Sequence, residues 1–108
     1  MGFEEEVRAA AFDALDNELN EARLVIERFE GGKVEQVQVA ANASLQIFLI
    51  TNNLLGSAQD KEDRLNGYRG HIGDARTKYG ELDQALQEGR RRLDVLEQLK
   101  AKTRTGNQ

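Results

Sequence analysis

Residues 65–99 read LNGYRGHIGDARTKYGELDQALQEGRRRLDVLEQL and carry two apolar rows that each repeat every seventh residue. The first row is Leu65, Ile72, Tyr79, Leu86 and Leu93, and the second is Tyr68, Ala75, Leu82, Gly89 and Leu96. This three–four offset is typical of the a and d positions of a coiled coil, which bury their side chains against another helix. The stretch therefore predicts a long helix that packs on a second helix, in the same chain or in a copy of it.

Glycines at positions 67, 70, 73 and 80 oppose this prediction. Each costs about 1 kcal/mol relative to alanine in a helix interior. Asn66-Gly67 is also a stop signal, and Asp74 could begin a new helix as its N-cap. Because the heptad phase continues unchanged across these glycines, we expect one helix over residues 58–102. It would have a soft segment at 66–74 and a frayed tail over 103–108.

The N-terminal residues carry a similar apolar pattern and predict a helix over residues 3–30. Three acidic side chains at positions 4–6 suit its first turn, where they interact favourably with the positive end of the helix dipole. Gly31 and Gly32 follow, and glycine commonly ends a helix. The apolar positions of this helix are Phe12, Leu15, Leu19, Ala22, Ile26 and Phe29.

Residues 33–55 allow two interpretations. As a β-hairpin, the segment would use the alternation at 37–39 and the strand-forming residues at 45–51, but the turn at 41–44 contains no glycine. As a helix, it is apolar on two sides, which is typical of a helix with neighbours on both. We expect the helix. Its two faces would be Val34, Val37, Ala41, Ser44 or Leu45, Phe48, Thr51 and Leu55, and Ala43, Ile47, Ile50 and Leu54.

The charge of −4 is unevenly distributed: residues 1–56 carry ten acidic and four basic side chains, and residues 57–108 carry nine acidic and eleven basic ones. Such halves suit packing against one another, although basic residues also collect at helix C-termini because of the dipole. The acidic N-terminus does not resemble a signal peptide, and no apolar run is long enough to span a membrane. We expect a cytoplasmic protein that does not enter a membrane.

Together these patterns predict an all-α fold with a single domain over residues 1–108. The helices at 3–30, 33–55 and 58–102 would form a three-helix antiparallel bundle or hairpin. Since the third helix is much longer than the second, the C-terminal part of its seam either runs back along the first helix or extends past the bundle. In the second case a monomer would expose that part of the seam, so we expect a homo-oligomer, most simply a dimer. The expected oligomer or partner seam consists of Leu65, Tyr68, Ile72, Tyr79, Leu82, Leu86, Leu93, Leu96, Ile47, Ile50 and Leu54.

Few groups in this chain could converge for catalysis. His71 is the only histidine, Ser44 and Ser57 are the only serines, and no nucleophile motif surrounds them. The chain has no cysteine, and we expect neither an enzyme nor a metal or cofactor protein. The leading hypothesis is a protein–protein interaction module, such as an adaptor, a chaperone-like binder or an assembly component, that acts as a homo-oligomer.

Two other functions are alternatives to this hypothesis. The glycine-rich segment at 67–80 gathers side chains that suit a small anionic or nucleotide-like ligand at an oligomer interface. Its candidate residues are Tyr68, Arg69, Arg76, Lys78 and Tyr79. The basic C-terminal stretch, including Arg90, Arg91 and Arg92, could contact phosphates in a DNA-associated regulator, although the net charge of the chain is negative.

Overall fold

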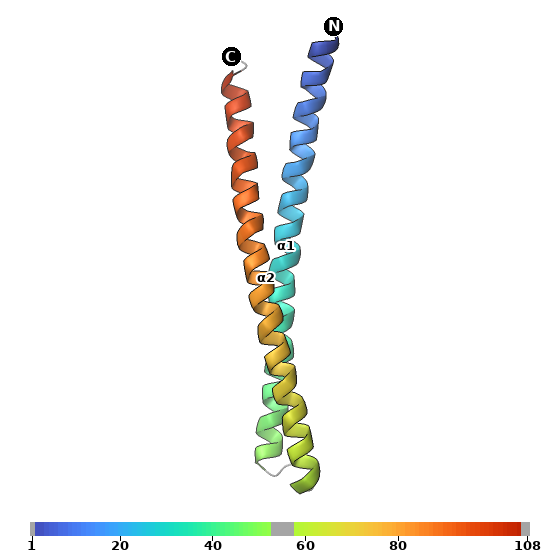
Figure 1. The fold of residues 1–108 in the computed structure, drawn as a ribbon, viewed down its shortest axis with the longest axis vertical. Helices are drawn as coiled ribbons and strands as arrows, with labels where there is room; N and C mark the ends of the chain where they lie inside the picture. The colour runs from blue at the N-terminus through green and yellow to red at the C-terminus, as the bar shows by residue number, and fades with distance from the viewer. Residues whose placement is uncertain (1, 53–57, 107–108) are drawn as a thin grey trace. The chain divides into compact units, whose positions relative to one another are not determined.

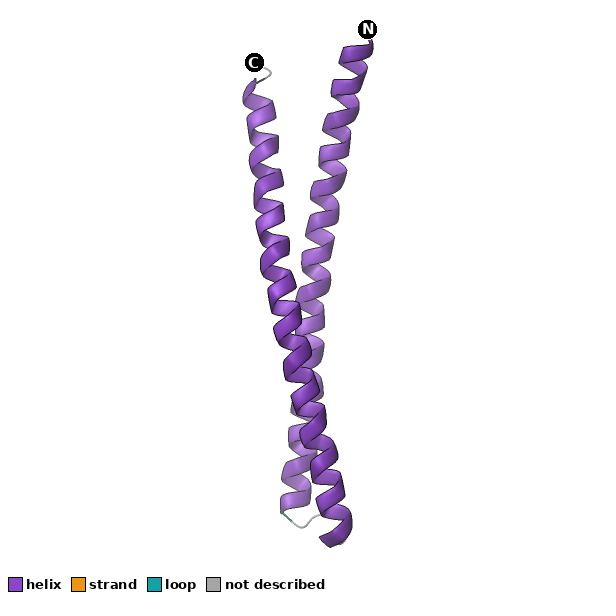
Figure 2. Cartoon of the chain, in the orientation of Figure 1, coloured by secondary structure: helices purple, strands orange, loops and turns teal. Residues whose placement is uncertain are grey.

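The computed structural model describes residues 2–52 and 58–106, and within these ranges it contains two α-helices and no strand. Helix α1 spans Phe3–Thr51 and helix α2 spans Ala58–Gly106 (Figure 1). Figure 2 shows the same two helices coloured by secondary structure. The chain has no proline to interrupt a helix, and its composition favours helix formers. The predicted all-α class is confirmed.

The predicted division of the N-terminal half into helices at 3–30 and 33–55 is wrong, because α1 continues through Gly31 and Gly32. Positions that are buried or half-buried recur every third or fourth residue from Phe12 to Ile50, without a change of phase. Two helical glycines cost about 2 kcal/mol, and a seam that continues on both sides of them offsets this cost. The described residues therefore form two helices rather than the predicted three.

The helical interpretation of residues 33–55 is confirmed as far as Thr51, and the hairpin interpretation of these residues is wrong. Residues 53–55 lie outside the described residues. The long helix predicted over 58–102 is confirmed, and it passes through residues 66–74 without a break. It ends later than predicted, because residues 103–106 are helical rather than frayed.

The ends of α1 satisfy part of their free backbone groups locally. At the start, the Glu6 amide donates to the Gly2 carbonyl at 3.2 Å. At the end, Asn52 donates twice to the Phe48 carbonyl, from its backbone amide at 3.1 Å and from Nδ2 at 2.8 Å. Both bonds go to the same carbonyl, which is one of the four acceptors that every helix end leaves open.

The chain comprises two compact units, each built from one part of α1 and one part of α2. The first unit comprises Met1–Phe29 and Ala85–Gln108. Its buried apolar side chains are Leu19, Ala22 and Leu86, of which the two leucines are each 2% exposed. Gly89 of α2 lies close to α1, since a Cβ added there would be 3.4 Å from Cγ1 of Ile26.

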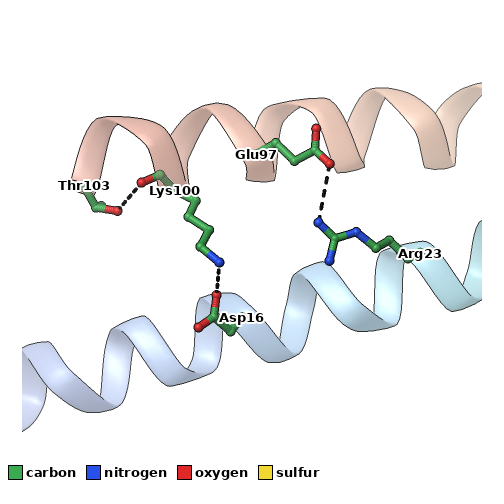
Figure 3. A network of polar contacts seen from close by, with 5 residues as sticks. All are labelled: Asp16, Arg23, Glu97, Lys100 and Thr103. Atoms are coloured by element: carbon green, nitrogen blue, oxygen red, sulfur yellow. Dashed lines mark hydrogen bonds and ion pairs between the residues drawn. The ribbon is translucent and has the colours of Figure 1, made fainter. Parts of the chain in front are cut away.

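Ion pairs join α1 and α2 within the first unit. Lys100 lies 2.7 Å from Asp16 and Arg23 lies 3.6 Å from Glu97, as Figure 3 shows. Each pair joins an α1 residue to an α2 residue, and each member is more than a third exposed. Exposed pairs of this kind contribute at most about 1 kcal/mol each, so apolar burial provides most of the stability of this unit.

The second unit comprises Glu30–Gln84. Its buried apolar side chains are Ala43, Ile50 and Ala75, each less than 5% exposed. Gly32 packs on the Leu82 side chain, because a Cβ added to this glycine would lie 3.1 Å from Leu82 Cδ1. In this unit, glycine is the residue that allows α1 and α2 to approach at this point.

Neither helix contains a stretch, among the described residues, that is long and apolar enough to cross a bilayer.

Candidate functional site

A charged residue occupies a seam position of α1 in the second unit. The Lys33 side chain is 20% exposed, and its Nζ donates to Oδ1 of Asp83 at 2.6 Å. The same Nζ lies 4.7 Å from the centroid of the Tyr79 ring, in a cation–π contact. Because a polar residue at a single seam position fixes the register of paired helices, this cluster holds residue 33 of α1 beside residues 79 and 83 of α2.

The environment of Lys33 favours its charged form. The hydrogen bond to Asp83 raises the pKa of Lys33 above its ordinary value of 10.5, and desolvation by burial acts in the opposite direction. Tyr79 adds to the upward shift of this pKa. Sequence reasoning missed Lys33, because a lysine after two glycines is also typical of an exposed helix end. The signal that could have identified it is its place in the apolar repeat, four residues after Phe29.

An apolar groove lies beside this cluster, within the second unit. It has a volume of about 260 Å³ and is lined by Gln36, Val37, Ala40, Ile72, Ala75, Arg76 and Tyr79. Two of the five predicted ligand-binding residues, Arg76 and Tyr79, therefore share one groove. Its mostly apolar lining and small volume, compared with the ~300–1,000 Å³ of typical ligand pockets, suit an inserted side chain better than a nucleotide.

The structure does not bring the other predicted ligand-binding residues into this groove. The Tyr68 ring contacts His71 edge to face, with 5.9 Å between the ring centroids. Arg69 donates to the Asn66 side chain at 3.4 Å, three residues before it on α2. Lys78 is exposed. The predicted five-residue cluster is thus divided among separate local contacts.

The predicted seam residues of α2 lie on its buried side. Leu86 is 2% exposed, the other six apart from Tyr79 are half-buried, and Tyr79 is 39% exposed. On α1, Ile50 is 2% exposed and Ile47 is half-buried, whereas Leu54 lies outside the described residues. These side chains are covered, wholly or partly, within the single chain.

One of the three predicted DNA-contacting arginines is paired with a carboxylate of α1. Arg92 donates to Oε2 of Glu18 at 2.7 Å, within the first unit. Arg90 takes part in a polar interaction as well, and Arg91 is exposed. One of the three guanidinium groups is thus already paired with a carboxylate, which lowers its availability to a phosphate.

Among the described residues of the second unit, most of the exposed large apolar side chains are on α1. Val34, Val37, Leu45 and Phe48 are 62%, 52%, 53% and 61% exposed, and Ala41 between them is exposed too. We call these five residues the 34–48 stripe. Their spacing of three, four, four and three residues places them on one side of α1, roughly a third of a turn from its seam. This is the first of the two apolar faces expected for residues 33–55, whereas the seam prediction used the second.

The sequence around the stripe lacks charge. From Gln36 to Gln59, 24 consecutive residues include no Asp, Glu, Lys, Arg or His, in a chain that is 31% charged. At that composition, about seven charged residues would be expected in 24 positions. Depletion of charge together with exposed apolar side chains is characteristic of the core of a protein–protein interface. A search for uncharged runs in the sequence would have found this segment.

Comparisons with protein-family models, with curated proteins and with solved structures found no match to this chain.

Proposed function

We propose that this chain is a helical protein–protein interaction module that self-associates through the 34–48 stripe and acts by contact rather than by catalysis. The observation that carries the proposal is the exposure of Val34, Val37, Leu45 and Phe48, each more than half exposed on one side of α1. An exposed apolar patch of a few hundred Å² is about the largest that a typical monomer carries, and such a patch is often a functional surface. A partner that covers this stripe would remove the unfavourable hydration of these side chains.

The area of the stripe fits a contact between proteins. If a fully exposed side chain of this size presents roughly 150–200 Å², the four larger members present on the order of 400 Å² to solvent. Standard interfaces bury about 800 Å² on each partner, and slightly more than half of that area is non-polar. The stripe supplies about the non-polar area of such an interface, and the uncharged polar residues around it supply the polar area.

The proposal is tested by the solution mass of matched variants. Sedimentation velocity from about 1 to about 300 µM should show the wild type shifting from monomer to a larger species. The Phe48→Glu variant should remain monomeric, because a carboxylate on the stripe would be desolvated in the contact. The control is Val39→Glu, which makes a similar change at a side chain that is 45% exposed. Val39 lies roughly half a turn around α1 from the stripe.

Circular dichroism should confirm that both variants remain helical. If the wild type stays monomeric over the whole concentration range, the proposal is wrong. If Val39→Glu dissociates the complex as completely as Phe48→Glu, the chain self-associates through a different surface.

A second candidate function is the binding of a small anion beside Arg76. Its support is the groove in which Arg76 and Tyr79 lie together. In a thermal-shift series with inorganic phosphate and nucleotides, a true ligand at 100 times its dissociation constant should stabilise the wild type by about 2.7 kcal/mol. The Arg76→Ala variant should lose this stabilisation, whereas Arg69→Ala, outside the groove, should retain it. No shift with any of these anions would exclude this candidate.

A further inference from the structure

The 34–48 stripe is symmetrical in its spacing about Ala41. Val37 and Leu45 lie four residues before and after this alanine, and Val34 and Phe48 lie seven residues before and after it. From this symmetry, and resting on the proposed self-association, we infer that two copies pair α1 against α1 in antiparallel orientation. The two-fold axis passes beside Ala41 of each copy.

The antiparallel pairing matches large side chains with smaller ones. Val34 of one copy lies opposite the second copy's Phe48, and Val37 lies opposite the second copy's Leu45. At the axis the two Ala41 side chains meet, where their small size lets the helices come close. The parallel pairing would instead place Phe48 on Phe48 and Val34 on Val34. In the parallel pair, some facing positions would hold two large side chains and others two small ones. Efficient packing instead places large side chains opposite small ones.

The distribution of charge suits a second copy of this chain as the occupant. The part of α1 from Gln36 to Thr51 carries no charged side chain, so two copies of it meet without repulsion between like charges. The same contact made by residues 4–30 would bring together two surfaces with nine acidic and three basic side chains each. Like charges placed opposite one another at an interface cost several kcal/mol. Of these two parts of α1, only the segment around the stripe suits contact with itself.

The closest acidic residue does not oppose the antiparallel orientation. Glu35 of one copy would lie level with residues 46 and 47 of the second copy, which are uncharged. Such a two-fold contact is isologous, which means that it closes at two copies and leaves no stripe exposed for further growth.

Single cysteines test this arrangement directly, because the natural chain contains none. A disulfide needs Cα atoms about 4.4–6.8 Å apart. In the antiparallel pair, a residue comes this close to the same residue of the second copy only at the two-fold axis. The Ala41→Cys variant should therefore form a covalent dimer under mild oxidation. The Val34→Cys variant should not, because its two copies would lie about 21 Å apart along the helices. An equimolar mixture of Val34→Cys and Phe48→Cys should give the mixed dimer.

Val39→Cys, exposed but away from the stripe, measures the rate of disulfide formation by random collision. We expect Ala41→Cys, and the mixed pair, to cross-link at least tenfold faster than this control. Light scattering under reducing conditions establishes whether each variant is dimeric before oxidation.

The possible failures are distinguishable. If Val34→Cys cross-links with itself as fast as Ala41→Cys, the pair is parallel, and only the orientation inferred here is overturned. If the protein is dimeric but no stripe cysteine exceeds the Val39→Cys rate, self-association holds and the stripe is the wrong surface. If the wild type and all variants are monomeric under reducing conditions, this inference and the proposed function both fail.

Discussion

The two adjacent glycines of α1 provide the sharpest test of the fold. In a helix interior, glycine to alanine stabilises by about 1 kcal/mol, because the backbone loses less entropy on folding. A Cβ added at Gly31 meets no atom within 4 Å, so Gly31→Ala should increase the free energy of unfolding by about that amount. At Gly32 the added Cβ lies 3.1 Å from Leu82 Cδ1 and 3.4 Å from Cδ2.

Gly32→Ala should be the less stable of the two variants. It gains the same helix propensity, but Leu82 must move away from the new methyl group. Overpacking at a filled contact costs typically 1–3 kcal/mol, so we expect this variant to be about 1–3 kcal/mol less stable than Gly31→Ala. Because the two sites are neighbours on one helix, the comparison removes the effect of propensity.

Urea unfolding followed by circular dichroism at 222 nm measures both differences. The corresponding thermal shift for Gly31→Ala should be about 4 °C upward. All samples should have the same protein concentration, since self-association makes apparent stability depend on concentration. A loss of stability in Gly31→Ala would refute a continuous α1, because alanine is unfavourable where a helix ends in the left-handed conformation. Equal gains in both variants would refute the expected overpacking against Leu82.

Three further predictions concern side chains at the contacts between the helices. Leu86→Ala, at a leucine that is 2% exposed, should reduce the free energy of unfolding by about 2–5 kcal/mol in a urea titration, and a loss below 1 kcal/mol would contradict its burial. Because its folded-state pKa is raised above 10.5, Lys33 should stabilise the fold below that pH and lose this contribution as pH rises through the folded-state pKa. The stability of the wild type relative to Lys33→Met should therefore be greater near pH 8 than near pH 11.5, and a difference that does not change with pH would disprove the coupling. Arg92→Ala breaks an exposed pair with Glu18 and should cost at most about 1 kcal/mol by the same assay, so a larger loss would show that the pair is less solvated than its geometry indicates.

The helical class and the course of α2 could be predicted from the sequence. Both depend on local information: helix-forming residues, the absence of proline, and an apolar repeat that keeps its phase through the four glycines of residues 67–80. A periodic apolar stripe predicts a helix wherever the chain can bury it, because helices gain most of their stability from such packing. The glycines in α2 therefore weaken the helix without ending it.

The continuity of the apolar repeat did not by itself show that α1 is one helix. Its repeat passes through Lys33 and Gln36, which are polar, just after two glycines. From the sequence these four positions indicate a turn. What makes them compatible with a buried seam is on α2: Leu82 fills the space above Gly32, and Asp83 and Tyr79 satisfy the ammonium group of Lys33. Residues about fifty positions away determine the helix here, and local propensity does not contain that information.

Tertiary packing also determined which of the two apolar faces of residues 34–51 is buried. Taken alone, the segment carries one face with Val34 and Phe48 and another with Ala43 and Ile50, and either could face a neighbouring helix. Sequence alone therefore favoured a helix with apolar residues on two sides. In the folded chain, α2 covers the face of α1 that continues the apolar repeat of residues 12–29. This contact determines that Ala43 and Ile50 are buried, while Val34 and Phe48 stay exposed. A single neighbouring helix covers only one side of α1, so the other side keeps its contact with water until a partner covers it.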